Sequence, residues 1–78
     1  MKKQIDIIEK KLSELLKIMP YQAYLKFIYN NKKIKLYDYV MGRVELGVLP
    51  AEWINNLSPS FLNAVEREIN NALKYYNL

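Results

Sequence analysis

The chain has 78 residues, a formal net charge of +4, and neither cysteine nor histidine. These counts exclude disulfide cross-links, a thiol nucleophile and the commonest ligand of transition metals. Because 51% of the residues are hydrophobic, a disordered chain is excluded as well, and we expect a single domain over residues 1–78.

The first predicted element is a helix over residues 3–18. Its apolar residues recur at alternating spacings of three and four, which is typical of a helix that packs along one stripe. These residues are Ile5, Ile8, Leu12, Leu15 and Met19. Pro20 disfavours the helical conformation at the residue before it and should end the helix.

Two interpretations compete for residues 21–29. The helical interpretation rests on the spacing i, i+3, i+4, i+7, which is met by Tyr21, Tyr24, Leu25 and Ile28. Alternating apolar residues on both sides of Asn30-Asn31 instead allow a β-hairpin across residues 25–37. We favour the helix because four positions match it, and an α+β fold with this hairpin is the alternative.

The middle of the chain predicts a polar connector at residues 30–33 and a further helix over residues 36–46. Gly42 lies within that helix and weakens it. Gly47 follows the helix, and a glycine there can take the left-handed conformation that ends many helices.

The segment 47–61 contains the only tryptophan of the chain and two of its three prolines. Pro50 suits the first turn of a short helix, since its missing N–H would be unsatisfied there anyway. On that helix Trp53 is expected to plug a small core, because tryptophan is buried on average. The alternative is that Trp53 is an exposed anchor for a partner.

The last predicted helix covers residues 59–76, with Ser58 as its N-cap and Pro59 at its first position. Its apolar residues repeat the spacing of the first helix: Leu62, Val65, Ile69, Ala72 and Tyr76. The two terminal helices therefore match in pattern and length and should pack against each other. We predict an all-α bundle of four to five short helices.

The positive charge is concentrated in the first half of the chain. Residues 1–43 carry ten Lys or Arg and four Asp or Glu, whereas residues 44–78 carry two and four. The candidate nucleic-acid-binding residues are Lys26, Lys32, Lys33, Lys35 and Arg43, with tyrosines between them. A small DNA-binding regulator with a middle that resembles a helix-turn-helix is the alternative function. A solvated, Lys-rich turn explains the same residues.

The leading functional hypothesis is a non-enzymatic protein-interaction module. Seven tyrosines and one tryptophan in a chain this short cannot all be buried with partnered polar groups, and such residues are enriched at interfaces. The candidate interface residues are Tyr21, Tyr24, Tyr37, Tyr39, Trp53, Tyr75 and Tyr76. We expect the protein to associate with itself, as a homodimer, and to regulate or inhibit another macromolecule by binding it.

The residues offer little for catalysis. Without histidine and cysteine, the usual general base and the strongest nucleophile are missing, and no phosphate-binding loop is present. We therefore expect no enzyme, no cofactor and no metal site. A stretch long and apolar enough to span a membrane is absent from the sequence, so we expect a cytoplasmic protein; the composition suggests a phage or plasmid origin. A bacteriocin-immunity-type helical bundle is the third functional candidate.

Overall fold

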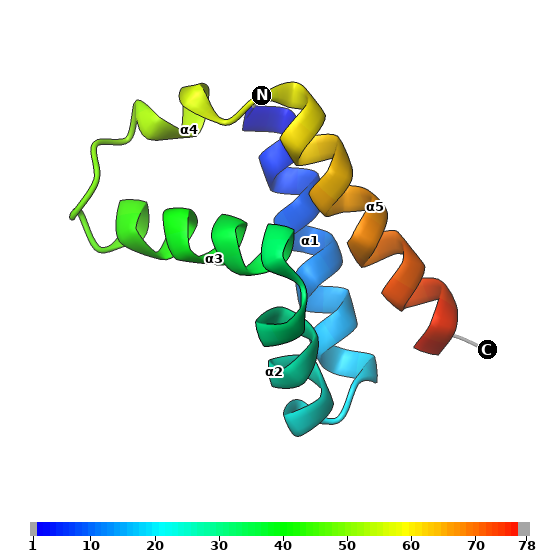
Figure 1. Ribbon diagram of the computed structural model, residues 1–78. Helices are drawn as coiled ribbons and strands as arrows, with labels where there is room; N and C mark the ends of the chain where they lie inside the picture. Colours follow the sequence, from blue (N-terminus) through cyan, green and yellow to red (C-terminus); the bar gives the residue numbers. More distant parts are fainter. Residues whose placement is uncertain (1, 77–78) are drawn as a thin grey trace.

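The computed structural model describes residues 2–76, and within this range the chain forms five helices and no strand (Figure 1). In chain order they are α1 (Lys2–Ile18), α2 (Tyr21–Asn30), α3 (Lys32–Glu45), α4 (Trp53–Asn56) and α5 (Pro59–Tyr76). The predicted all-α bundle is confirmed. The hairpin alternative is wrong, because residues 25–37 are helical on both sides of Asn31.

The terminal helices α1 and α5 form the most extensive contact between two elements, as their matched apolar stripes predict (Figure 1). Gln4 Nε2 donates to Asn63 Oδ1 at 2.6 Å, and Lys11 Nζ donates to Asn70 Oδ1 at 2.8 Å. Residue numbers rise together along both helices, so α1 and α5 run parallel. A parallel pair needs a long connection, and α2, α3 and α4 supply it.

The core lies where α3 crosses this pair. The buried side chains that cluster there come from α1, α3 and α5, and they are Ile5, Ile8, Leu12, Ile34, Tyr37, Leu62, Val65 and Ile69. Every buried member of the two terminal helices in this cluster belongs to a stripe that the sequence predicts. Periodicity therefore identifies the inner faces of α1 and α5 correctly.

The polar connector predicted at residues 30–33 is wrong in its length. Asn31 alone lies outside the helices, with an extended backbone (φ −101°, ψ 105°), and α3 begins at Lys32. The Asn31 side-chain oxygen accepts hydrogen bonds from the backbone N–H groups of Lys33 and Ile34, both at 3.2 Å. This is N-cap geometry, and it starts α3 four residues earlier than the apolar spacing indicates.

The other predicted helix boundaries agree with the structure to within one residue, except that α4 begins at Trp53 and does not include Pro50. Gly47 has φ +76° and follows the end of α3, as expected of a left-handed C-terminal glycine. Ser58 Oγ accepts from the Phe61 N–H at 3.1 Å, and Pro59 is the first residue of α5. The turn that leads into α4 begins at Pro50, whose carbonyl accepts from the Trp53 N–H at 3.0 Å.

The prediction that Trp53 plugs the core is wrong, because its side chain is 44% exposed. The core is filled without it: Tyr37 is the largest fully buried side chain, at 1% exposed. The α4 segment has no buried residue, although Ile54 and Leu57 pack against the edge of the core. With only four residues, α4 is too short to bury the whole indole ring of Trp53 against the rest of the protein.

Candidate functional site

The predicted interface residues do not form one surface. Tyr37 is buried, so its prediction as an interface residue is wrong for this structure. Tyr24 is half-buried on α2, and five of the predicted residues are exposed, which are Tyr21, Tyr39, Trp53, Tyr75 and Tyr76. Tyr75 and Tyr76 stack edge to face at the end of α5, with ring centres 5.0 Å apart.

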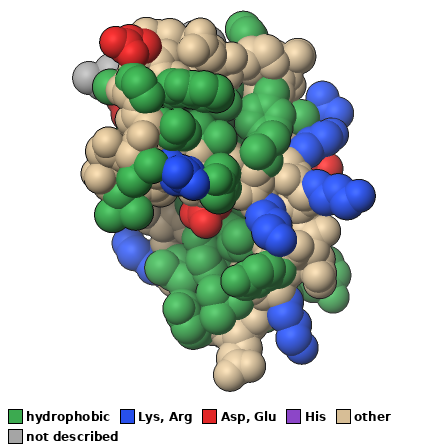
Figure 2. All heavy atoms as spheres, turned by 60° about the vertical axis from the view of Figure 1, so that its left-hand side comes forward, with side chains coloured by type: hydrophobic (Ala, Val, Ile, Leu, Met, Phe, Trp, Pro, Cys, Tyr) green, Lys and Arg blue, Asp and Glu red, His purple; other side chains and the backbone are tan. Residues whose placement is uncertain are grey.

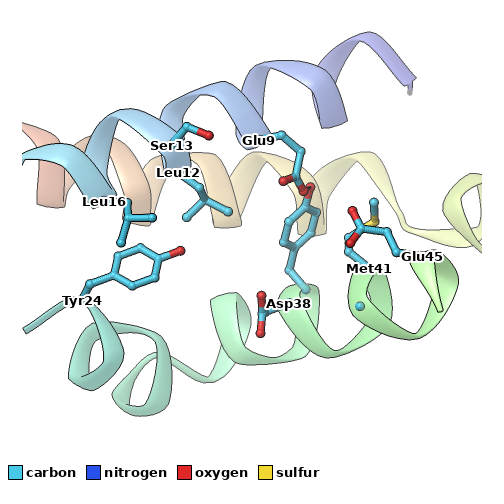
Figure 3. Close-up of a pocket in the computed structure, with 10 residues that line it drawn as sticks. Glu9, Leu12, Ser13, Leu16, Tyr24, Asp38, Met41 and Glu45 are labelled. Atoms are coloured by element: carbon cyan, nitrogen blue, oxygen red, sulfur yellow. Dashed lines mark hydrogen bonds between the residues drawn. The ribbon is translucent and has the colours of Figure 1, made fainter. Parts of the chain in front are cut away.

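A small cavity of about 180 Å³ lies between α1, α2 and α3 (Figure 3). Its walls combine apolar side chains with three carboxylates, from Glu9 on α1 and from Asp38 and Glu45 on α3. Tyr24 points its hydroxyl into this space from α2. On another wall, the Tyr37 hydroxyl donates to Glu9 Oε1 at 2.8 Å.

Burial and acidic neighbours keep both tyrosines of the cavity protonated. Burial raises the pKa of Tyr37, and the hydrogen bond to Glu9 raises it further, since that bond requires the phenol proton. Burial also raises the pKa of Tyr24, and the negative charges of Asp38 and Glu9 add to the effect.

The cavity has no arrangement of groups that suggests chemistry. Its one aliphatic hydroxyl, on Ser13, has only carboxylates and tyrosines around it as possible bases. Among the described residues, no group of three or more acidic side chains is placed to hold a metal ion.

The outer surface of α3 differs from its inner face. Ile34, Tyr37 and Val40 are buried on the inner side of this helix. Successive residues of a helix are separated by about 100° around its axis, which places one set of residues on the outward side: Lys32, Lys35, Leu36, Tyr39 and Arg43. All of these are exposed except Arg43, which is half-buried. Leu36 is 51% exposed and Tyr39 is 55% exposed.

Three depressions meet on this outward side of α3. The first, about 310 Å³, lies against α2 and shares Lys35 and Tyr39 with the second, which is about 270 Å³. The second shares Leu36 with the third, about 370 Å³, which reaches Trp53. Because their walls are common, the depressions form a continuous surface. We call it the belt and define it by Tyr29, Lys32, Lys35, Leu36, Tyr39 and Trp53.

Apolar side chains make up most of the belt. The third depression is lined by Leu36, Val40, Trp53, Asn56, Leu57, Ser58 and Phe61, with no charged side chain among them. Figure 2 turns the left-hand side of Figure 1, where α3 and α4 lie, toward the reader; hydrophobic side chains cover much of that face, and most Lys and Arg side chains lie toward one edge.

The basic residues predicted to bind nucleic acid separate into two groups. Lys32 and Lys35 line the belt, and Arg43 follows on the same side of α3. Lys26 and Lys33 are exposed but line none of the three depressions. The structure thus brings Lys32, Lys35 and Tyr39 together, with Trp53 beyond Leu36.

Sequence reasoning missed Leu36 as a member of this surface and considered Tyr29 only among the tyrosines of the nucleic-acid alternative. A helix expected to begin at Leu36 leaves Lys32 and Lys35 outside it, so their place beside Leu36 was hidden. Asn31 was the available signal, because asparagine is among the most favoured N-cap residues. A helix that begins after Asn31 places Lys32, Lys35 and Leu36 on one side, away from Ile34.

The chain matches no known family model, and no curated protein or solved structure is significantly similar to it. Within residues 2–76, every helix is too short or too polar to cross a membrane. The functional argument therefore rests on the geometry of the belt.

Proposed function

We propose that this protein is a non-enzymatic interaction module that regulates or inhibits another protein by binding it through the belt. The observation that carries the proposal is a run of exposed apolar side chains on the outward side of α3 and on α4. Leu36, Tyr39 and Trp53 are 51%, 55% and 44% exposed, and none of them belongs to the buried core cluster.

The belt has the composition of a binding surface. Aromatic residues are enriched at the centres of protein interfaces, where they supply most of the binding energy. Scattered single apolar residues are normal on a protein surface, but contiguous apolar patches mark interaction sites. The shared walls of the three depressions make this patch contiguous.

The test compares Leu36→Glu with Ile7→Glu. Both substitutions replace an exposed apolar residue by a carboxylate, but Ile7 lies on α1 and lines none of the three depressions. Each variant serves as bait for capture of partners from cells of the native host, with quantification by mass spectrometry. We expect Leu36→Glu to lose partners that the wild type and Ile7→Glu retain. Equal capture by all three proteins would contradict the proposal.

Self-association is the second part of the proposal. Sedimentation of the wild type at high micromolar concentration should show a dimer. If the wild type remains monomeric, self-association is contradicted, and the proposed binding of a different protein still stands.

A DNA-binding regulator is the second candidate function, and one observation favours it. Lys32, Lys35 and Arg43 share the outward side of α3, and among the acidic residues of α3 only Asp38 reaches one of the three depressions, whereas Glu45 reaches none. Phosphate contacts of this kind make binding depend on salt. Binding of duplex oligonucleotides by the wild type, reduced in Lys32→Ala/Lys35→Ala and weakened by salt, would support this function.

A further inference from the structure

Two aromatic rings of the belt each have a cation over them, one from Lys35 of the belt and one from the neighbouring Arg43. Lys35 Nζ is 5.2 Å from the centre of the Tyr29 ring, across the boundary between α3 and α2. The Arg43 guanidinium is 5.2 Å from the centre of the Tyr39 ring, and its Nη1 donates to the Tyr39 hydroxyl at 2.6 Å. Cations and apolar surface are therefore presented together.

Within residues 2–76, Lys32, Lys35 and Arg43 form no ion pair with an acidic side chain. Among the side chains that the structure describes, the one ion pair joins Lys11 to Glu66, between α1 and α5. Asp38 is the single acidic residue among those that line the three depressions. The belt thus carries uncompensated positive charge at its α2 and α3 side and is uncharged at its α4 side.

We propose that the belt binds an acidic amphipathic helix of a partner protein. Apolar side chains on one face of that helix would fill the depressions on either side of Leu36. Carboxylates flanking this face would pair with Lys32, Lys35 and Arg43. The inference rests on the proposed function and adds the chemistry of the partner. A helix that lays its apolar face into a groove is a recurring mode of recognition.

Two other occupants fit the belt less well. A second copy placed belt to belt would bring its own Lys32 and Lys35 close to those of the first copy, with one Asp38 on each side to offset four lysines. Nucleic acid would satisfy the cations, but its phosphates would leave unfilled the uncharged depression between Leu36, Trp53 and Phe61. An acidic amphipathic helix satisfies both the charged and the apolar parts.

The test is selection of binders from a displayed library of random peptides of about 15 residues, a length at which isolated helices are marginally stable. The full-length wild type is the bait. We expect the enriched peptides to be acidic, with apolar residues at the spacing i, i+3 or i+4, i+7. Their affinity should fall about tenfold or more in Lys32→Glu/Lys35→Glu and in Leu36→Glu.

A matched control separates local pairing from net charge. Lys10→Glu/Lys17→Glu makes the same change in charge on exposed positions of α1, and we expect it to keep at least most of the affinity. Replacing the acidic residues of a selected peptide by lysine should restore its binding to Lys32→Glu/Lys35→Glu. Circular dichroism of each variant checks that it is folded.

Three results would overturn the inference. Neutral or basic peptides that bind and are lost in Leu36→Glu would exclude an acidic partner and leave the proposed function standing. Peptides whose binding is unchanged in Leu36→Glu would contradict both. The third result is that no peptide is enriched, or that a duplex or single-stranded oligonucleotide displaces the acidic peptides at physiological salt. In either case an acidic helix is not the occupant. Partner capture with Leu36→Glu then tests the proposed function separately.

Discussion

The α1–α5 pair and the α2–α3–α4 segment both carry many apolar residues, yet they use them differently. In α1 and α5 a regular stripe of apolar residues is buried, although Ile7 and Leu16 of α1 lie outside it and are exposed. Polar side chains such as Lys11 and Glu66 link the two helices at their border. In α2 no residue is buried, although seven of its ten residues are apolar. The pair stabilises the fold, and the middle segment presents surface.

This difference teaches that apolar content alone does not identify the core. A regular stripe on a long helix can be covered completely by one neighbour. In the middle segment, α2 and α4 bury no residue, so they leave apolar surface exposed to solvent. Exposed apolar surface of this kind is costly to keep in a monomer, and binding is the function that it best explains.

The largest expected effect comes from the stripe of α5. Ile69→Ala removes a fully buried side chain from the core, and we expect the free energy of unfolding to fall by about 2–5 kcal/mol. Leu36→Ala on the belt should cost less than about 1 kcal/mol, because its side chain is half-exposed. Urea denaturation of both variants measures the contrast. Equal losses would mean that the belt contributes to the core.

Trp53→Ala tests the surface position of the indole. Since the side chain is 44% exposed, we expect a loss of about 2 kcal/mol rather than the about 3–5 kcal/mol of a core aromatic residue. The variant should remain folded and should lose the partners that bind through the belt. An unfolded variant, detected by circular dichroism, would restore the interpretation of Trp53 as a plug.

Tyr37→Phe tests the polar contact that joins α3 to α1. The variant leaves Glu9 without its hydrogen-bond donor, and we expect a loss of about 1–2 kcal/mol near neutral pH. The contribution also depends on pH. An unfolded tyrosine ionises near its ordinary pKa of 10.0, whereas folded Tyr37 stays protonated because its pKa is raised. The folded state then binds more protons, so its stability falls as the pH rises above about 10.

Urea denaturation as a function of pH measures this effect. We expect the fall above about pH 10 to be steeper in the wild type than in Tyr37→Phe, by up to about 1.4 kcal/mol per pH unit. Tyr24 keeps a raised pKa in both proteins and contributes equally to each. Identical pH profiles would show that Tyr37 does not hold its proton more tightly when folded.

The effects expected at the two glycines are small and have opposite signs. Gly47 has φ +76°, so Gly47→Ala should destabilise the protein by about 1–2 kcal/mol through backbone strain. Gly42 lies inside α3 with nothing within 4 Å of an added Cβ, so Gly42→Ala should stabilise the protein by about 0.5–1 kcal/mol. Thermal unfolding of Gly47→Ala and Gly42→Ala measures the sign of each change in stability. If both variants lose stability, the open space beside Gly42 is contradicted.

Much of the fold could be predicted from local rules. The bounds of α5 follow from Ser58, Pro59 and the stripe of Leu62, Val65 and Ile69. The end of α3 follows from Gly47. The start of α3 was missed although Asn31 is a favoured N-cap residue. The exposure of Trp53 could not be predicted in the same way, because it depends on which neighbours reach a four-residue helix.

The candidate site was less predictable than the fold. Spacing along the chain suggested Tyr39, Trp53, Lys32 and Lys35 separately, and it gave no reason to place Leu36 between them. Tyr37 was assigned to the interface although it is the central aromatic residue of the core. A helix expected to begin only at Leu36 left Lys32 and Lys35 outside it, so their place on the same side of α3 as Leu36 could not be read from the spacing.

The sequence by itself determines the helical class, the two terminal stripes and the turns at Pro20, Gly47 and Ser58, because these depend on residues close together in the chain. Tertiary structure alone decides that α1 and α5 run parallel and that the inner side of α3 crosses them. It also decides that Lys35, Leu36 and Trp53 share one surface. The physical reason is that burial depends on which distant helix covers a face, and the spacing of residues within a helix does not specify that neighbour.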